Sequence, residues 1–434
     1  MAIQENITQP FQENITHPFL RPFDQTVSVA ALDAYRLRRL NQQLRYAAVH
    51  SRYYRDMLAG IRLPLGSPDD FLSLPFTAAE DVLHHGTDMV CAEAASIERI
   101  VTIQSAGSSG APKRLHFTGG DLVRTVDFFH EGMRYLCGPG DDVFIFMPSA
   151  SEYSIGRLLA DGLLALGANP LVFGMIGDAE KAATVLRGHR PHTIVGIPAQ
   201  MRKLALLEPD IRPANVLLSA DYIPLSVKET ISRIWDCEVF EHYGLTESGY
   251  GCAVECPAYQ GQHIRHDELL LEIIDPDSGE SAPAGQWGEI VLTTLRREAM
   301  PLIRYRTGDI SRLITEACAC GSVLPRLDRV RGRAGELTEG VNIYEMDELL
   351  LQCDELLTYR ATLEGRRLTV AAEVRAPEGY GACERKLAVR WPALAIDVVP
   401  MQAQTQSTPQ PAPLPADILS AARAAKRGID RKGV

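Results

Sequence analysis

The sequence has no excess of positive charge. Its 434 residues contain 44 lysines and arginines against 55 aspartates and glutamates, which gives a net charge of −11. A protein that binds the phosphate backbone of a nucleic acid usually presents a strongly basic surface. The composition therefore argues against nucleic acid as the main partner, whereas a small anionic ligand needs only a few local donors.

Long hydrophobic runs are also lacking. The most apolar stretch, Leu158–Gly177, is interrupted by Asp161, Asn169 and Pro170. A membrane-spanning helix needs about 20 consecutive apolar residues, so we expect no span. The first residues carry early acidic side chains and no basic-then-apolar pattern, and we therefore expect no secretory signal.

Cysteine is sparse, at nine residues spread over the chain. An odd number of scattered cysteines is typical of a protein of the reducing cytoplasm rather than of a disulfide framework. With 46% hydrophobic residues, a chain of this length can bury a core without disulfides and is long enough for two or three domains.

Apolar strands alternate with helical patterns between Pro64 and Gly261. Strands that alternate with helices predict an α/β fold with a largely parallel sheet. Ahead of this region, Val29–Leu58 has apolar residues at helical spacing and predicts one amphipathic helix or two. The candidate strands are Arg99–Ile103, Asp142–Met147, Asn169–Phe173, Thr193–Gly196, Val216–Ser219 and Cys237–Glu241.

A different pattern begins after Gly261. Leu269–Ile274 and Gly288–Thr294 are apolar and β-rich, and the Asp-Pro-Asp-Ser-Gly sequence between them favours a turn. We expect a small antiparallel, β-rich subdomain here. It would complete a large N-terminal domain over residues 1–334.

The remaining residues, 335–434, are predicted to form a small α+β C-terminal domain. Tyr359–Leu363 and Leu368–Val374 are its strand-like runs. Gln402–Pro415 is rich in Gln, Thr and Pro and favours a linker, and a basic helical tail is expected over Ile418–Val434.

The N-terminus carries a tandem repeat of eight residues. Gln4–Phe11 reads Gln-Glu-Asn-Ile-Thr-Gln-Pro-Phe, and Gln12–Phe19 repeats it with one change. Two short copies are too few for a solenoid, so we interpret the repeat as an extended lead-in.

The strongest local signal for chemistry is the Ser105–Lys113 segment, Ser-Ala-Gly-Ser-Ser-Gly-Ala-Pro-Lys, which follows an apolar run. Small flexible residues allow backbone amides to turn inward around an anion, and the lysine adds a cation. The segment lacks the Walker pattern, and an ordinary Gly/Ser surface loop is the alternative. The predicted phosphate-binding residues are Ser105, Gly107, Ser108, Ser109, Gly110 and Lys113.

A second signal is His242–Gly249, which reads His-Tyr-Gly-Leu-Thr-Glu-Ser-Gly after a strand-like run. Tyr243 offers a flat face for stacking a base, and Thr246 could bind a phosphate. Glu247 could hold Mg²⁺, which prefers carboxylate oxygens together with substrate phosphates. The alternative is a glycine-rich turn with an incidental acid.

Two further segments suggest recognition of a ribose. The Thr-Gly-Asp sequence that ends at Asp309 exposes one carboxylate, which suits two vicinal hydroxyls. Arg333, in Arg-Gly-Arg, can supply fixed donors to a ribose or a phosphate. A solvated salt bridge is the alternative for each residue.

In their order and separation, these four segments resemble the adenylate-forming superfamily of acyl-CoA synthetases, adenylation domains and luciferases. The resemblance covers nearly the whole chain and is strongest to the phenylacetate-CoA ligase branch. Three more segments look like that branch: Leu37–Tyr54, Leu74–Thr77 and Gly340–Ile343.

The resemblance implies an enzyme that uses ATP and Mg²⁺ to activate a carboxylic acid as an acyl-adenylate, and then transfers the acyl group to coenzyme A. It implies a cytoplasmic enzyme with small-molecule partners, and it is compatible with a homodimer. The acid would be of the phenylacetate, benzoate or anthranilate type. A carrier-loading adenylation enzyme and a degenerate, zinc-stabilised adenylate-binding protein are the alternatives.

The resemblance also assigns roles to residues. Ser219, Ala220 and Asp221 would lie beside the adenine, with Tyr243 and Gly244. Asp309 would hold the ribose hydroxyls near Arg333. The small C-terminal domain would rotate between the two half-reactions and present Gly340, Val341 and Asn342 for attack by the thiol. The predicted catalytic residues are Lys426, Thr246, Glu247 and His242.

The acid pocket is expected near five residues from three loops. His242 or Arg157 could meet a substituent or the carboxylate of the acid. The five residues are Tyr153, Ser154, Ile197, Pro198 and Tyr222.

Cysteine and histidine form a further pattern. Cys256 and His263 follow the Tyr243 segment, and Cys318 and Cys320 follow the Asp309 segment. Thiolates and imidazole are zinc ligands, and four of them close a structural site. Some members of the branch look similar here. Cys252 is an alternative ligand, and four unrelated residues are the other interpretation.

Two positions depart from the family pattern. Gly335 stands where the hinge normally has an acidic residue or a lysine, and glycine can still serve as a hinge. The tail lacks the usual Gly-Lys pair before Asp430, so Lys426 is the candidate for the adenylation lysine.

Replacing Lys426 with Ala should slow pyrophosphate release and leave thioester formation from synthetic acyl-adenylate at its parental rate.

Replacing Gly335 with Pro, which fixes φ and removes an amide donor, should block one half-reaction more than the other. Assaying each step alone checks both. If Lys426→Ala adenylates at the parental rate, the tail holds no catalytic lysine at this position.

Overall fold

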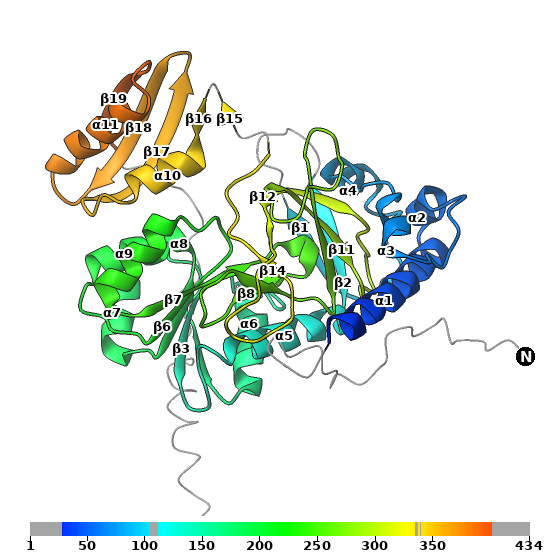
Figure 1. Ribbon diagram of the computed structural model, residues 1–434. Coiled ribbons are helices and arrows are strands. Elements are labelled where there is room, and N and C mark those ends of the chain that lie inside the picture. Colours follow the sequence, from blue (N-terminus) through cyan, green and yellow to red (C-terminus); the bar gives the residue numbers. More distant parts are fainter. Residues whose placement is uncertain (1–27, 104–111, 335–336, 339, 402–434) are drawn as a thin grey trace, which may run out of the picture. The chain divides into compact units, whose positions relative to one another are not determined.

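The structure is a computed structural model that describes residues 28–103, 112–334, 337–338 and 340–401 (Figure 1). The tandem repeat, the glycine-rich part of the predicted phosphate loop, Gly335 and Lys426 lie outside these residues. Within them, no helix combines the length and apolar character that crossing a membrane requires.

The predicted N-terminal helices are α1 (Val29–His50) and α2 (Arg52–Met57). The side chain of Ser28 caps the start of α1 by accepting from Ala31 N. Ser51 ends α1 and also caps α2 by accepting from Tyr54 N. One serine therefore sets the break between the two helices.

A nine-stranded mixed sheet forms the centre of the described residues. Its parallel half, in the order β4-β3-β5-β6-β7, confirms the predicted α/β fold. The strands are β3 (Asp142–Phe146), β4 (Asn169–Val172), β5 (Thr193–Gly196), β6 (Asn215–Leu218) and β7 (Glu238–Tyr243).

Helices pack on both faces of this parallel half (Figure 1). Alternate strand residues belong to two hydrophobic clusters: Ile145 and Phe240 pack with α5 and α6, and Phe144 and Val239 pack with the other three helices. This alternation is the period of two of a β-strand. The helices are α5 (Gly119–Met133), α6 (Ile155–Ala165), α7 (Ala179–His189), α8 (Pro198–Leu207) and α9 (Leu225–Trp235).

One predicted strand is in a different sheet from the one expected. Arg99–Ile103 falls in β1 (Ile97–Ile103), which pairs antiparallel with β2 (Lys113–Thr118) as a separate two-stranded sheet. The chain returns directly alongside β1 instead of crossing through a helix, so a parallel connection cannot form. The prediction of a strand was confirmed, and its place in the parallel sheet was wrong.

The predicted β-rich region is an antiparallel sheet of β10 (Leu269–Ile274), β11 (Gly288–Thr294) and β12 (Tyr305–Ser311). After β10, Asp275 accepts hydrogen bonds from the amides of Asp277 and Ser278, and Gly279 has a φ of +73°. The turn chemistry of the sequence therefore holds in the structure.

The other half of the nine-stranded sheet is antiparallel and runs from β7 outward. Its short strands carry the cysteine and histidine pattern on the loops that join them. They are β8 (Ala253–Glu255), β9 (Gln262–Ile264), β14 (Arg326–Leu327) and β13 (Leu313–Ile314).

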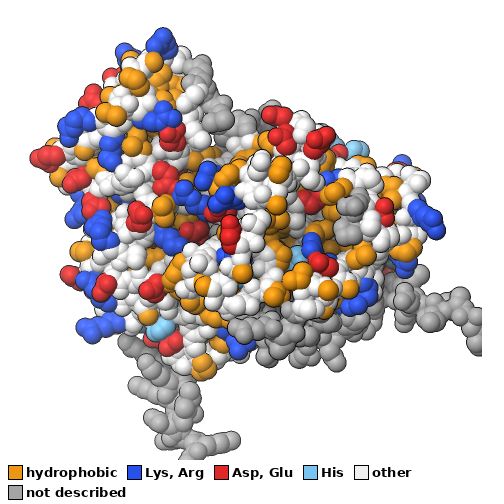
Figure 2. All heavy atoms as spheres, viewed as in Figure 1, with side chains coloured by type: hydrophobic (Ala, Val, Ile, Leu, Met, Phe, Trp, Pro, Cys, Tyr) orange, Lys and Arg blue, Asp and Glu red, His pale blue; other side chains and the backbone are white. Residues whose placement is uncertain are grey.

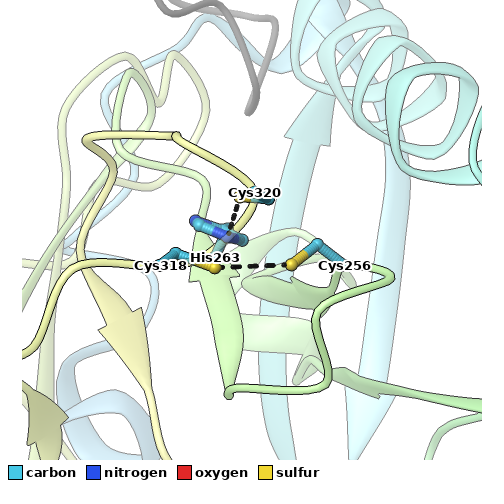
Figure 3. Close-up of side chains that lie close together, drawn as sticks. All are labelled: Cys256, His263, Cys318 and Cys320. Carbon is cyan, nitrogen blue, oxygen red and sulfur yellow. Dashed lines mark hydrogen bonds between the residues drawn. The ribbon is translucent and has the colours of Figure 1, made fainter.

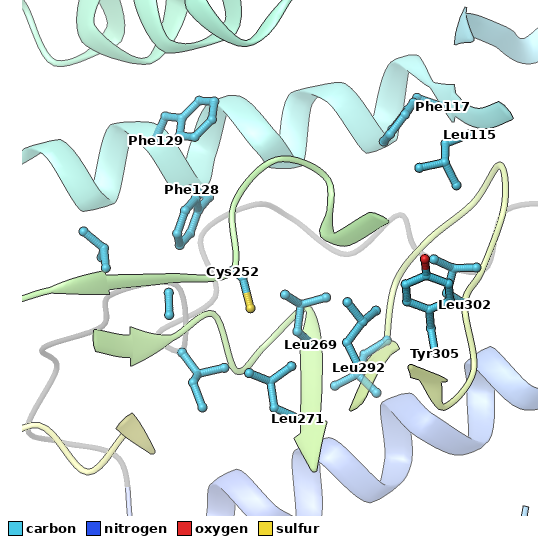
Figure 4. Close-up of a cluster of buried hydrophobic side chains, with 14 of the residues drawn as sticks. Leu115, Phe117, Phe128, Phe129, Cys252, Leu269, Leu271, Leu292, Leu302 and Tyr305 are labelled. Atoms are coloured by element: carbon cyan, nitrogen blue, oxygen red, sulfur yellow. The ribbon is translucent and has the colours of Figure 1, made fainter. Parts of the chain in front are cut away.

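The core joins these layers. Figure 4 shows Phe128 and Phe129 projecting from α5, while leucines of β10 and β11 fill the space farther along. Asp121, in the first turn of α5, joins this helix to the loop after β11, because it accepts from the amides of Glu298 and Ala299. Its neighbour Arg124 pairs with the same carboxylate at 2.7 Å.

A two-stranded sheet, β15-β16, precedes a three-stranded sheet, β17-β18-β19. The predicted strands Tyr359–Leu363 and Leu368–Val374 lie within β17 and β18, which pair antiparallel. The elements are β15 (Leu337–Thr338), β16 (Val341–Asn342), α10 (Ile343–Leu350), β17 (Leu356–Glu364), β18 (Arg367–Val374), α11 (Glu378–Arg390) and β19 (Ala395–Pro400).

Buried polar contacts join this sheet to the helices of the parallel half. The guanidinium of Arg202, on α8, donates to the carbonyls of Leu351, Cys353 and Leu356 at 2.9, 2.7 and 2.7 Å. Glu348, on α10, accepts from the first amides of α9. All these elements belong to one compact unit that ends at Pro400, and the domain boundary at residue 335 stays a prediction.

Replacing Arg202 with Ala should lower the melting temperature, because three buried carbonyls lose their donor. A buried group left without its partner costs about 1–3 kcal/mol. The control is Lys203→Ala, which removes only a partly exposed ion pair with Glu373 and should cost at most about 1 kcal/mol. Equal shifts for the two variants, measured by thermal denaturation, would contradict this role.

Candidate functional site

The candidate site begins at the carboxyl ends of β6 and β7. In parallel strands these ends lie along one edge of the sheet, where α/β proteins bind ligands. Ser219 follows β6, and His242 and Tyr243 close β7. The Ser219 Oγ lies 2.7 Å from His242 Nδ1, so two predicted site residues 23 positions apart are in direct contact.

Lys113 and Glu247 meet at this edge. The ammonium of Lys113, at the start of β2, lies 2.8 Å from Glu247 Oε1, and both side chains are nearly buried. The predicted phosphate-binding lysine and the predicted Mg²⁺ ligand are therefore neighbours. Thr246 stands beside Glu247 in the short helix η3 (Thr246–Ser248).

Tyr305, which the sequence analysis did not single out, completes this group. Its hydroxyl donates to Glu247 Oε1 at 3.0 Å and lies 3.1 Å from the Lys113 ammonium. Burial and the charge of Glu247 raise the pKa of Tyr305, which keeps the hydroxyl protonated as a donor. Its position four residues before Asp309, on the same strand, could have identified Tyr305 as a candidate site residue.

The predicted ribose-binding residues converge as well. The hydroxyl of Tyr243 donates to Asp309 Oδ2 at 2.8 Å, and Arg333 Nε lies 3.2 Å from Asp309 Oδ1. Arg333 also donates to the carbonyl of Thr307 at 2.8 Å. Burial, with the nearby carboxylate of Asp309, raises the pKa of Tyr243 well above its ordinary value. Stacking of Tyr243 on a base stays a prediction.

Two tight turns shape this edge. A Cβ on Gly244 would lie 2.1 Å from the carbonyl oxygen of Tyr250, so only glycine fits there. Ala220 has a φ of +68°, a left-handed conformation that is strained for alanine. Its predicted neighbour at the adenine, Asp221, accepts from the amide of Tyr222. Strained backbone of this kind is common at ligand sites.

The five predicted acid-pocket residues come from separate segments of the chain. Ser154 immediately precedes α6 and donates to the carbonyl of Ser151, and Tyr153 precedes it. Ile197 and Pro198 begin α8. Tyr222 turns toward α10, where its hydroxyl donates to Glu348 at 3.2 Å.

The positions expected to face the thiol lie at β16, just before α10. Gly340 has a φ of +78°, and its carbonyl accepts from the indole of Trp391. Asn342 caps α10 by accepting from Tyr344 N, and Val341 is buried. Their role toward coenzyme A stays a prediction.

A buried apolar cavity of about 30 Å³ lies between α5, α6 and the sheet. His242 and Ser219 are its polar residues, and Ile155 and Val195 lie one and two positions from the predicted pocket residues Ser154 and Ile197. The α5 side chains Phe128, Phe129 and Met133, which also line it, were missed. They belong to no motif, and only the position of α5 against the sheet brings them to the site.

The predicted metal ligands form a compact cluster (Figure 3). Their four ligand atoms lie within 4.8 Å of one another. Cys256 Sγ is 3.6 Å from Cys318 Sγ, and Cys320 Sγ is 3.3 Å from His263 Nε2. Two sulfurs bound to one tetrahedral zinc lie about 3.8 Å apart, so the spacing fits that metal.

The electrostatics of His263 suit a ligand. Burial, and then the charge of Arg326, lower its pKa to about 4, so the imidazole is neutral at pH 7, as a metal ligand must be. A tight turn, in which Gly321 N donates to the carbonyl of Cys318, brings the two loop cysteines together. Cys252, the alternative ligand, is buried outside the four-residue group.

The surface agrees with the net charge. On the face shown in Figure 2, basic and acidic side chains of the described residues lie interspersed rather than gathered by sign. This distribution differs from the continuous basic stripe of a typical nucleic-acid-binding protein.

Comparisons with solved structures agree with this architecture. A 2-hydroxyisobutyryl-CoA ligase in the postadenylation state, in complex with 2-HIB-AMP, superimposes with a TM-score of 0.76 at 20% identity, over 93% of this chain and 94% of that chain. The anthranilate CoA ligase AuaEII in complex with anthranoyl-AMP gives a TM-score of 0.52 at 15% identity, over 76% of this chain and 69% of that chain. At these identities the likeness shows the fold.

Sequence comparison identifies the family. The phenylacetate-coenzyme A ligase of Thermus thermophilus is 29% identical over 362 residues, which are 78% of this chain and 79% of that protein. The ligase of the same name from Pseudomonas putida is 29% identical over 76% of this chain and 78% of its own length. The family model described as AMP-binding enzyme matches residues 70–295, more than half of the sequence. The chain belongs to the AMP-binding enzyme family.

Proposed function

We propose that this protein is an ATP-dependent, AMP-forming ligase that activates an aryl carboxylic acid and transfers it to coenzyme A. The observation that carries the proposal is the meeting of Lys113, Tyr243, Glu247 and Asp309 at one edge of the sheet. The names of the relatives, phenylacetate-coenzyme A ligases, supply the class of acid and the thiol.

The first step joins acid and nucleotide. A carboxylate oxygen attacks the α-phosphorus of ATP, the bond to the β-phosphate oxygen breaks, and pyrophosphate leaves. Fixed cations and donors stabilise the negative charge that develops on the phosphate oxygens. Lys113 supplies such a cation, and Tyr305 positions it. Asp309, held by Tyr243, accepts from the ribose hydroxyls.

Glu247 is the residue that would hold Mg²⁺. Its carboxylate is nearly buried and already binds one cation, the ammonium of Lys113. A Mg²⁺ ion beside it would neutralise phosphate charge, as this metal does in many nucleotide sites. ATP phosphates would then take over Lys113 from the carboxylate.

The second step forms the thioester. The sulfur of coenzyme A attacks the acyl carbon, the bond to the phosphate oxygen of AMP breaks, and AMP leaves. We expect the segment from Gly340 to Asn342 to take part in this step. It lies at β16, just before α10, and Glu348 of α10 accepts from the first amides of α9.

A panel of aryl acids with ATP and Mg²⁺ tests the function. At least one phenylacetate-type or benzoate-type acid should give acid-dependent pyrophosphate release, and adding coenzyme A should give a thioester and AMP. Supplying a phosphopantetheinyl carrier protein in place of coenzyme A shows which of the two thiols the enzyme acylates. If none of the acids in the panel causes pyrophosphate release, the proposal is contradicted.

Replacing Lys113 with Ala should lower kcat/KM for ATP by about 10- to 150-fold. A hydrogen bond to a charged group contributes about 1.5–3 kcal/mol, and each 1.36 kcal/mol is a factor of ten. The matched control is Lys181→Ala, a highly exposed lysine of α7. Equal activity of both variants would remove Lys113 from the mechanism.

We also propose that Cys256, His263, Cys318 and Cys320 hold one structural zinc ion. Four protein ligands leave no open position, so such a site stabilises the antiparallel part of the sheet rather than taking part in the reaction. The ligands come from the loops after β8 and β13 and from β9 itself. A metal there would link the short strands β8, β9 and β13.

Protein prepared without chelator should contain about one zinc per chain by elemental analysis. Replacing Cys318 with Ser should remove it and lower the melting temperature, because structural zinc contributes directly to folding. Replacing Cys252 with Ser should leave the zinc content unchanged. Zinc that persists in Cys318→Ser, or is lost in Cys252→Ser, would contradict this ligand set.

A further inference from the structure

The apolar cavity beside the nucleotide site contains one polar group that the described residues leave unsatisfied. Its walls are aromatic, aliphatic and sulfur-containing, with Phe128, Phe129, Met133 and Met147 among them. His242 enters this wall as a nearly inaccessible side chain, 6% exposed. The rings of Phe128 and Phe129 lie 5.8 and 6.2 Å from its imidazole.

The two nitrogens of His242 differ in their surroundings. Nδ1 lies 2.7 Å from Ser219 Oγ, whereas Nε2 is buried and has no hydrogen-bond partner among the described residues. The contact with Nδ1 is a hydrogen bond with the Ser219 hydroxyl. If that hydroxyl donates to Nδ1, both groups are satisfied and the proton of the neutral ring is on Nε2.

The ring is neutral in this environment. Burial lowers the pKa of His242 to about 4. With Ser219 as the donor to Nδ1, the N–H of the neutral ring is on Nε2, where no described residue accepts from it, which is a costly arrangement for a buried donor. A ligand that brings an acceptor to this position removes that cost.

The volume of the cavity limits what the acceptor can be. About 30 Å³ is room for one or two water-sized groups, whereas a benzene ring needs a cavity on the order of 150 Å³. A water molecule would find few polar partners here, because Ser219 is already bound to Nδ1. A hydroxyl group carried on a larger ligand fits better, with the flexible Met133 and Met147 adjusting to its ring.

We propose that His242 determines the specificity of the acid site, and that the activated acid carries a hydroxyl group whose oxygen accepts from His242 Nε2. The inference rests on the proposed ligase function and names the class of its substrate: a hydroxylated aryl acid. The hydroxyl is the group that reaches the cavity, while the carboxylate lies toward Lys113 and Thr246.

Matched pairs of acids test the proposal. Benzoate and phenylacetate are compared with their 2-, 3- and 4-hydroxy derivatives, using ATP and coenzyme A and measuring kcat/KM for each acid. At least one hydroxylated isomer should exceed its parent by about 10- to 100-fold, because a site built around a hydrogen bond rejects the analogue that lacks the partner.

Two variants assign the preference to His242. His242→Leu removes the donor and should reduce the ratio between hydroxylated and parent acid to about one. His242→Gln keeps an amide donor of similar reach and should retain part of the ratio. A preference that survives in His242→Leu, or a parent acid used as well as all its hydroxylated isomers by the unchanged protein, overturns the proposal.

Calorimetry of the acids without ATP separates this inference from the proposed function. Tighter binding of a hydroxylated acid than of its parent, lost in His242→Leu, supports the assignment even if no acid is adenylated. Absence of that difference in binding and in turnover overturns it, while acid-dependent pyrophosphate release with the unhydroxylated parents would leave the ligase function standing.

Discussion

Parallel pairing of β3, β5, β6 and β7 places the carboxyl ends of these strands along one edge of the sheet, and the site depends on that constraint. Ser219, His242 and Tyr243 reach the edge directly from the strand ends. The remaining residues come from antiparallel elements, β2 and β12, and are held there by polar contacts. The ion pair of Lys113 with Glu247, 2.8 Å long, joins the β1–β2 hairpin to the turn after β7.

These polar contacts hold each reactive side chain before a ligand arrives. Bringing Lys113 and Glu247 out of water has a desolvation cost, which their mutual attraction and the Tyr305 hydroxyl offset. Asp309 is held in the same way by Tyr243 and Arg333. In the proposed function, phosphates and ribose hydroxyls would replace these partners, so that binding would exchange contacts instead of creating buried charge. Groups fixed in this way need little reorganisation during the reaction.

Local patterns predicted the local structure well. The bounds of β5, β10 and β11 follow from short apolar runs between turn residues. Sequence motifs identified Asp309 and Glu247 as candidate site residues. Placement across the fold was harder to predict. The strand at Arg99 was expected in the parallel sheet, because its pairing with Lys113–Thr118 depends on how the chain returns. Tyr305 and Arg202 contact partners 58 and 149 residues away, and the α5 side chains meet His242 only through the fold, which periodicity cannot show.

The order His242-Tyr243 explains how one strand serves two binding sites. Successive side chains of a strand point to opposite faces. His242 shares the face of Phe240 and lines the cavity under α5, whereas Tyr243 extends its hydroxyl to Asp309. In the proposed function, recognition of the acid and recognition of the nucleotide would thereby belong to adjacent residues with separate partners. A change at residue 242 would alter the cavity without removing the contact between Tyr243 and Asp309, so the acid accepted could vary while the proposed nucleotide site stays the same.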